Sequence, residues 1–418
     1  MKFINFLAIL LTLASCSTSK NYHTSNNRSN SLETQKKPYV LLISIDGYRW
    51  DYTDKYGPKF LKQFKESGAS VKSLRPSYPT KTFPNHLSLA TGSYPVNHGI
   101  VGNSFYAPTM REEYSLRNRE AVTDSRFYLA KPIWVLAEEQ SLLTATYFWP
   151  GSESEIDGLL PSYYLTYNHS TPHEDRINTV LKWYKLPEDK RPHLATLYFS
   201  DVDSAGHKYG PNSNEVKNAI FKVDQSIEKL NTELSKLNLP INIIIVSDHG
   251  MAEVDPKKFE LIASNELKEE IELSYKVIGS GPIVHFYMND NPQTNTTSLL
   301  ERINRNADHF KCYDKASTPK KLNFRDSDRI GDFVCIANRD WSIGLTKGSL
   351  PKGNHGWSQY EGMDMHSILY AKGPNFKDSF QIKTINNIDL YPMIAKLLDL
   401  KINHTIDGTI KYSKELLK

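Results

Sequence analysis

YVLLISIDG, residues 39–47, decides the fold class, because it is an unbroken apolar run that ends in an aspartate and a glycine. The same pattern returns in HLATLYFSDVD at residues 193–203 and in INIIIVSDHG at residues 241–250. Continuous runs of Val, Ile and Leu are typical of strands buried on both faces, as in parallel sheets. The three stretches therefore predict strands of a mostly parallel sheet and hence an α/β fold.

The segments between these strands have the spacing of amphipathic helices. GPKFLKQFKESGA ends at Gly68, and residues 213–238 carry an apolar stripe from Val216 to Leu237. HSILYAKG, residues 366–373, predicts a later strand, and NNIDLYPMIAKLLDL, residues 386–400, predicts a closing helix. Residues 265–345 mix short strands and helices, so we expect a small α+β elaboration there on the same sheet.

Length and composition describe a globular protein. The chain has 418 residues, of which 39% are hydrophobic and 23% charged, enough for one large domain or two. The formal net charge is only +4, and no run of Lys and Arg interleaved with aromatic residues marks a polymer-binding groove. Nucleic acid is therefore not expected as a partner.

The first residues, MKFINFLAILLTLASC, have the features of an export signal: one basic residue, a short apolar run and small residues before Cys16. We expect a signal peptide over residues 1–15, which is too short for an ordinary membrane helix. LASC resembles a bacterial lipobox, which implies a lipid on Cys16 that anchors an exported protein to a membrane; a plain secretory peptide is the alternative. Residues 16–37 are polar and predict a flexible tether, which leaves residues 38–414 as the main domain.

Two cysteines remain after Cys16. In an oxidising export compartment a lone pair of thiols is readily oxidised, so we expect a disulfide between Cys312 and Cys335. Each lies in a short apolar stretch, HFKCY and DFVCIA, and the two could form neighbouring strands. Two free buried cysteines are the alternative.

The three predicted strands deliver carboxylates to one place. Ligands bind beyond the carboxyl ends of the strands in open parallel sheets, so Asp46, Asp203 and Asp248 are expected to converge. His207 follows Asp203 by four residues, and His249 follows Asp248 directly. A single aspartate there is usually a helix cap, but three with two nearby histidines are not explained that way. Oxygen and imidazole ligands without thiolate suit zinc, with manganese or iron as alternatives.

Two further stretches could belong to the same site. In YPTKTFPNH, residues 78–86, Thr82 and Asn85 are either turn residues beside prolines or, in the case of Thr82, a nucleophile that needs a base or a metal. In KGNHGWS, residues 352–358, glycines flank His355, so the backbone could approach a metal closely.

These motifs, with FWPGS at residues 148–152, resemble the nucleotide pyrophosphatase/phosphodiesterase family of the alkaline-phosphatase superfamily. The resemblance rests on residues 78–103, DVDSAGHKYGP, SDHGM, GNHG and the closing helix, and it covers about residues 38–405. It implies an alkaline-phosphatase-like central sheet with helices on both faces, and it makes residues 38–414 a phosphodiesterase catalytic domain.

The resemblance also implies two zinc ions per chain and a role for each candidate residue. Thr82 would be the nucleophile and would bind the first zinc with Asp46, Asp248 and His249, while the second zinc would be held by Asp203, His207 and His355. Asn103 matches the residue that donates to a phosphoryl oxygen. No metal position is left for His86, His98 or His366, which we interpret as structural or as hydrogen-bonding partners of the ligands.

The implied reaction is hydrolysis of phosphodiester or pyrophosphate bonds through a phosphothreonine. We expect a nucleotide or related diester whose base stacks between Phe83 and Tyr167. Choline-containing lipids, other diesters and, through the nearby Lys81, phosphomonoesters are alternatives. A sulfatase would have a C-x-P-x-R motif where this chain has TFPNH, and a ligand-binding lipoprotein without turnover would not need the full ligand set.

Overall fold

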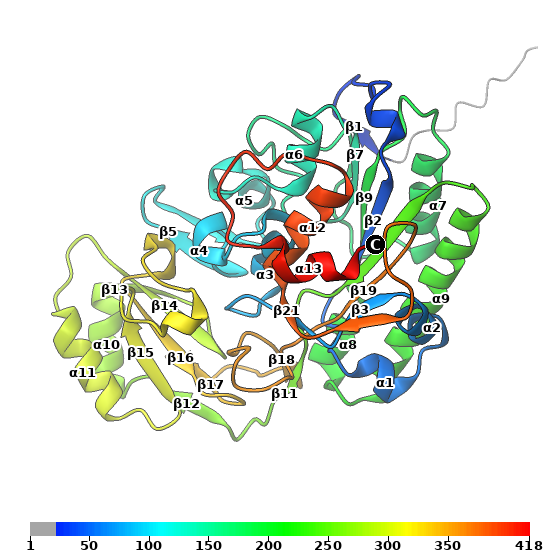
Figure 1. Ribbon diagram of the computed structural model, residues 1–418. Helices are drawn as coiled ribbons and strands as arrows, with labels where there is room; N and C mark the ends of the chain where they lie inside the picture. Colours follow the sequence, from blue (N-terminus) through cyan, green and yellow to red (C-terminus); the bar gives the residue numbers. More distant parts are fainter. Residues whose placement is uncertain (1–21) are drawn as a thin grey trace, which may run out of the picture.

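The computed structural model describes residues 22–418 and contains a nine-stranded central sheet (Figure 1). The three predicted strands form β2 (Tyr39–Ile45), β9 (Leu194–Phe199) and β10 (Ile241–Val246). β2 lies between β9 and β10 and is parallel to both. The leader and Cys16 lie outside the described residues, so lipidation stays a prediction.

The rest of the sheet extends from both sides of this parallel centre. Its order is β1-β8-β7-β9-β2-β10-β19-β3-β20. β8, β7, β9, β2 and β10 are parallel, whereas β1 and β19 are antiparallel to their neighbours. The sheet is therefore mostly parallel, as predicted. The remaining strands are β1 (His23–Thr24), β3 (Ala69–Val71), β7 (Thr144–Tyr147), β8 (Tyr163–Leu165), β19 (Leu369–Lys372) and β20 (Phe380–Ile382).

Helices cover both faces of this sheet (Figure 1). Alternate residues of β2 enter two separate apolar clusters, Val40 and Leu42 on one face and Leu41 and Ile43 on the other. This two-sided burial explains the unbroken apolar run. One face packs against α2 (Lys59–Ser67), α7 (His173–Tyr184) and α9 (Asn214–Ser235), and the other against α3 (Thr82–Thr91), α6 (Ile133–Glu139) and α12 (Leu390–Leu397).

The elaboration was expected on the main sheet, but its strands instead form a second, antiparallel sheet beside the main one (Figure 1, lower left). Its order is β13 (Tyr275–Ile278), β14 (Ile283–Met288), β16 (Phe333–Ala337) and β15 (Phe310–Asp314). With α10 (Asn265–Ser274) and α11 (Thr296–Arg305), it surrounds an apolar cluster that also contains Trp357. We call this unit the second sheet.

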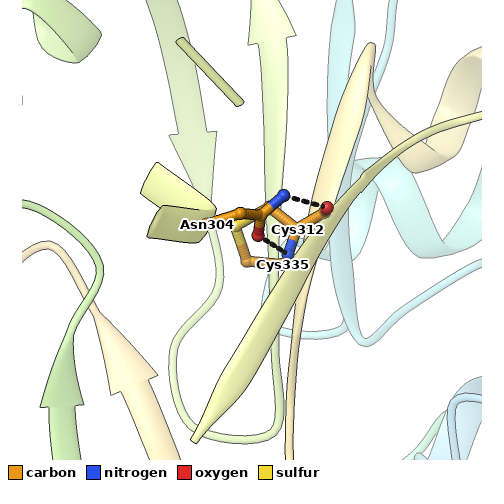
Figure 2. The surroundings of a disulfide bond; sticks show 3 residues. All are labelled: Asn304, Cys312 and Cys335. Atoms are coloured by element: carbon orange, nitrogen blue, oxygen red, sulfur yellow. Dashed lines mark hydrogen bonds between the residues drawn. A yellow bond between two sulfur atoms is a disulfide. The ribbon is translucent and has the colours of Figure 1, made fainter. Parts of the chain in front are cut away.

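The predicted disulfide joins the last two strands of the second sheet. Cys312 of β15 lies opposite Cys335 of β16, with 3.9 Å between their Cα atoms. Figure 2 shows that Asn304 of α11 reaches the backbone of Cys312. Its Nδ2 donates to the Cys312 carbonyl at 2.9 Å, and its Oδ1 accepts from the Cys312 N–H at 2.8 Å.

Replacing both Cys312 and Cys335 with alanine is expected to lower the free energy of unfolding of the second sheet. The bond closes a loop over a separation of 23 residues, which the chain-entropy model values at about 3 kcal/mol. Urea unfolding curves of the variant and of the disulfide-bonded wild type, both followed by Trp fluorescence, measure the loss. An unchanged midpoint would show that the loop is already restrained in the unfolded chain.

The expected tether over residues 16–37 is wrong for residues 22–37, which pack on the domain. β1 pairs with β8 at the sheet edge. Asn30 is buried, donates through Nδ2 to the carbonyls of Glu188 and Arg191, and accepts from the N–H of Leu143. Apart from Tyr22, whose ring meets Tyr163 and Trp183 edge-on, hydrogen bonds anchor this segment, so its polar composition concealed the packing. Over residues 22–418, no helix has the length and apolarity needed to cross a membrane.

Candidate active site

Thr82 is the first residue of α3, where the sequence suggested a Phe-Pro turn. Proline is compatible with the first helical turn, because the N–H groups there have no intrahelical acceptor. Asn85 braces the segment before the helix. Its Nδ2 donates to the carbonyls of Pro79 and Lys81 at 3.0 and 2.9 Å, and its Oδ1 accepts from the Ser77 N–H at 2.7 Å. Asn85 therefore fixes the chain that leads into Thr82.

The aspartates reach the site from two kinds of element. Asp46 directly follows β2, and Asp248 lies two residues beyond β10. The predicted position of Asp203 at a strand end is wrong, because β9 ends at Phe199 and Asp203 lies in the first turn of α8 (Asp201–Tyr209). Helical geometry then explains the spacing of four, since it puts His207 on the same face as Asp203.

Four predicted ligands surround one point. The Nε2 atom of His249 lies 3.3 Å from Oγ1 of Thr82, 3.4 Å from Oδ1 of Asp46 and 3.0 Å from Oδ2 of Asp248. The Asp46 and Asp248 side chains are buried. These four side chains are the set that the family resemblance implied for a first cation.

The other three predicted ligands form a second group. Oδ1 of Asp203 lies 3.4 Å from Nε2 of His207 and 3.6 Å from Nε2 of His355, and the two Nε2 atoms are 3.1 Å apart. The two groups adjoin, because ligand atoms of Asp46, Asp203 and His249 also lie within 4.8 Å of one another.

The histidines of both groups present a lone pair to the site. Nδ1 of His249, His207 and His355 each lies 2.7–2.8 Å from a backbone carbonyl, those of Gly250, Gly353 and Thr80. A carbonyl only accepts, so the proton of each ring is on Nδ1 and the lone pair is on Nε2. Two Nε2 lone pairs that face each other repel unless a cation or a proton lies between them.

The carboxylates of both groups also indicate that a cation belongs between these side chains. Oδ1 of Asp46, Oδ1 of Asp203 and Oδ2 of Asp248 are buried and have no hydrogen-bond partner among residues 22–418. A buried carboxylate oxygen without a donor or cation is costly. Burial, reinforced by the charges of Asp248 and Asp203, raises the pKa of Asp46 well above its usual range. The donor set therefore fits a pair of divalent cations.

Three other histidines hold the surroundings of the site. His86 contacts Oγ of Ser44 through Nε2 at 2.8 Å and the Thr82 carbonyl through Nδ1 at 2.9 Å, so both of its nitrogens are occupied although Asp248 is within reach. His98 donates to the Pro84 carbonyl at 3.0 Å, and burial lowers its pKa to about 3. Nε2 of His366 donates to the Gln359 carbonyl at 3.0 Å.

A cavity of about 420 Å³ opens beside Thr82. Phe83, Asn103 and Tyr167, the predicted substrate contacts, all line it. Oδ1 of Asn103 accepts from the Phe83 N–H at 3.0 Å, which leaves Nδ2 as its donor. Tyr167 is 43% exposed, and its ring meets Phe148 edge-on at 5.2 Å.

Sequence reasoning missed the charged wall of this cavity. Arg119 and Glu153 form an ion pair there, and Oε1 of Glu153 accepts from the Tyr167 N–H at 3.1 Å. No motif marked either residue, although Glu153 directly follows FWPGS. Lys81 does not line the cavity; its Nζ lies 3.3 Å from Oδ1 of Asn354, and burial lowers its pKa to about 8.

Known proteins resemble this chain in sequence and structure. A family model described as type I phosphodiesterase/nucleotide pyrophosphatase matches residues 40–358. Ectonucleotide pyrophosphatase/phosphodiesterase family member 1 of Homo sapiens is 39% identical over 405 residues, which cover 91% of this chain and 43% of the human protein. Bis(5'-adenosyl)-triphosphatase of Mus musculus is 35% identical over 387 residues, which cover 91% of this chain and 81% of the murine protein. The chain thus spans less than half the length of the human relative.

Solved structures give the same relationship. Murine ectonucleotide pyrophosphatase/phosphodiesterase 5 matches with a TM-score of 0.84 and 28% identity, covering 91% of this chain and 100% of the murine one. A threonine-to-alanine variant of that murine protein, described as inactive and in complex with AMP, matches with the same TM-score. The chain therefore belongs to the type I phosphodiesterase/nucleotide pyrophosphatase family.

Proposed function

We propose that the chain is a two-zinc hydrolase that cleaves phosphodiester or pyrophosphate bonds of nucleotides and related diesters through a phosphothreonine intermediate. One observation carries the proposal. Thr82 lies where the cluster of partnerless carboxylate oxygens and histidine lone pairs meets a cavity with aromatic walls.

The first cation would be held by Asp46, Thr82, Asp248 and His249, and the second by Asp203, His207 and His355. Carboxylate and imidazole donors suit zinc. A bound pair would supply positive charge at both the attacking and the leaving oxygen of an in-line displacement.

The chain's own residues then carry out two displacements. Oγ1 of Thr82 attacks phosphorus, its proton passes to solvent, and the bond to the leaving oxygen breaks, which gives a phosphothreonine that still carries the second ester group of the substrate. Water hydrolyses this ester, releases the monoester and restores the hydroxyl. Nδ2 of Asn103 donates to a non-bridging phosphoryl oxygen, and its contact with the Phe83 N–H fixes the orientation of the amide.

Two observations support a diester of a nucleotide as the substrate. Asn103 is a neutral donor and Lys81 lies outside the cavity, so neither offers a cation to the extra charge of a monoester. Of the two arginines that line the cavity, Arg117 and Arg119, the second is paired with Glu153. The rings of Phe83 and Tyr167 line the cavity, where a base could stack on them. The names of the relatives point the same way, since one is a bis(5'-adenosyl)-triphosphatase and another binds AMP.

Purified protein is expected to hydrolyse bis(p-nitrophenyl) phosphate faster than p-nitrophenyl phosphate, to lose this activity to a chelator and to regain it with zinc. Elemental analysis should give close to two zinc ions per chain. His355→Ala should preferentially empty the second site, because it removes one of three protein ligands. One metal in both proteins would contradict the assignment, and turnover that survives chelation would overturn the metal-dependent mechanism.

Tyr167→Ala is expected to lower kcat/KM for ATP about tenfold, since one stacked base is worth roughly 1–3 kcal/mol. Cleavage should occur at the α-phosphorus and give AMP and pyrophosphate. The Tyr167 N–H stays bonded to Glu153 in the variant, so only the ring is removed. Tyr167→Phe keeps the ring and serves as the control.

The small diester bis(p-nitrophenyl) phosphate needs no base pocket, so its hydrolysis by Tyr167→Ala should change little. Equal losses on both substrates, or a wild-type protein that prefers lysophospholipids to ATP, would overturn the nucleotide assignment.

A further inference from the structure

Thr80, two residues before the proposed nucleophile, makes three hydrogen bonds to the loop that carries His355. Its carbonyl accepts from Nδ1 of His355 at 2.7 Å. Its hydroxyl donates to the Trp357 carbonyl at 2.9 Å and accepts from the Gly356 N–H at 2.8 Å. Thr80 is fully buried, so water does not compete for these bonds.

The loop that carries His355 lies between a strand and an apolar cluster. It follows β18 (Gly353–Asn354), and beyond His355 it passes into the apolar cluster of the second sheet at Trp357. Gly356 has φ +124°, and a Cβ there would lie 2.6 Å from Cε of Lys81. The loop therefore lies directly against residues 80 and 81, and Thr80 is bonded to three of its consecutive residues, 355–357.

We infer that Thr80 is a positioning residue that holds His355 in place for the second cation. This inference rests on the proposed function. The hydroxyl fixes the backbone on the far side of His355, and the carbonyl fixes the tautomer and direction of the ring. One residue thus ties the segment of the nucleophile to a ligand that lies more than 270 positions away.

Removing the hydroxyl alone tests the inference. Thr80→Val keeps the shape and the carbonyl but leaves the Gly356 N–H and the Trp357 carbonyl without their partner. Losing a direct hydrogen-bond partner of a ligand typically costs about 10–100-fold in metal affinity, and the hydroxyl acts on His355 through the loop backbone, so we expect the lower end of this range. The dissociation constant of the second zinc, from competition with a chromophoric chelator, is expected to rise about tenfold or more, while the first zinc changes much less. Thr80→Ser, which keeps the hydroxyl, should restore tight binding.

Thr146→Val is the matched control. Thr146 lies in β7, is fully buried, and its hydroxyl has no hydrogen-bond partner among residues 22–418. Its replacement also removes a buried hydroxyl but should leave both zinc affinities unchanged. Circular dichroism of each metal-free variant shows whether it is folded.

The outcomes separate this inference from the proposed function. A wild-type protein that does not bind two zinc ions refutes the two-metal function itself. A wild-type protein that binds two, with a Thr80→Val variant that binds both as tightly as Thr146→Val does, overturns only the role of Thr80. If Thr80→Val does not fold, the inference is tested instead by amide hydrogen exchange of the zinc-free wild type. The Gly356 amide should be protected relative to exposed Gly348, and equal exchange contradicts the inference.

Discussion

Replacing Thr82 with alanine is expected to lower diester hydrolysis more than about a hundredfold while leaving the fold and most of the bound metal in place. The variant loses the attacking oxygen but only one of the four proposed ligands of the first cation. Its stability should hardly change, because the Thr82 side chain belongs to neither apolar cluster of the main sheet and caps no helix. Initial rates, zinc content and thermal unfolding of the same samples check the predicted loss of activity, the retained metal and the unchanged stability.

Thr82→Ser is the control for this experiment, because it keeps a hydroxyl at the same position and should retain measurable activity. Acid quenching of the wild type during turnover, followed by intact mass, should reveal a chain heavier by the phosphoryl group and its retained ester, which is the adenylyl group when ATP is the substrate, and the alanine variant should never show it. An alanine variant faster than about a hundredth of the wild-type rate would replace the phosphothreonine route with direct attack by water.

Asn103→Ala is expected to lower kcat about 10²–10³-fold, which corresponds to about 2.7–4 kcal/mol for one lost donor to the reacting phosphoryl group. The orientation of the Nδ2 donor is fixed before the substrate binds, because Oδ1 of the same amide accepts a hydrogen bond from the Phe83 N–H at 3.0 Å. Negative charge grows on the phosphoryl oxygens during the displacement, so a fixed donor acts most strongly in the transition state. The loss should therefore appear in kcat more than in KM.

Asn103→Asp gives the sharper comparison. It keeps an oxygen for the Phe83 N–H but presents a second, negatively charged oxygen where the donor was. We expect it to be slower than the alanine variant, because the carboxylate repels the phosphoryl group. An aspartate variant as active as wild type would show that Asn103 only braces Phe83, and unchanged zinc content in both variants excludes an indirect effect on the metal.

The sequence predicted the central strands well because their environment leaves a strong signal. β2 is buried on both faces, and its unbroken apolar run followed by Asp46 is the result. It could not predict that Asp203 lies on a helix, since a strand end followed by polar residues looks the same whether or not a helix begins there. The packing of residues 22–37 was missed because Asn30 is anchored by long-range hydrogen bonds that no local pattern encodes.

The residues that carry the chemistry of the site could largely be predicted from the sequence, whereas the groups that hold them in position could not. Strand ends, the first turn of α3 and the helix α8 bring the seven proposed ligands together. Residue types and spacing indicated the three aspartates, His207 and His249, whereas the roles of Thr82 and His355 were implied by the family resemblance. The carbonyls that set the histidine tautomers belong to Gly250, Gly353 and Thr80, and backbone oxygens leave no trace in a sequence. Arg119 begins a short helix, Arg119–Thr123, and Glu153 lies in a turn 34 positions away, so only the tertiary fold brings the two side chains together at one cavity.

The amide of Asn304 has a consequence for how copies of this protein behave at high concentration. β15 is the last strand of its sheet, and such an edge can recruit a strand from another chain and begin aggregation. By offering one donor and one acceptor to the backbone of Cys312, Asn304 occupies the groups that an incoming strand would use (Figure 2). Cys312 itself is bonded covalently to Cys335 of the neighbouring strand β16. An incoming strand would therefore have to displace the Asn304 amide before it could pair at Cys312.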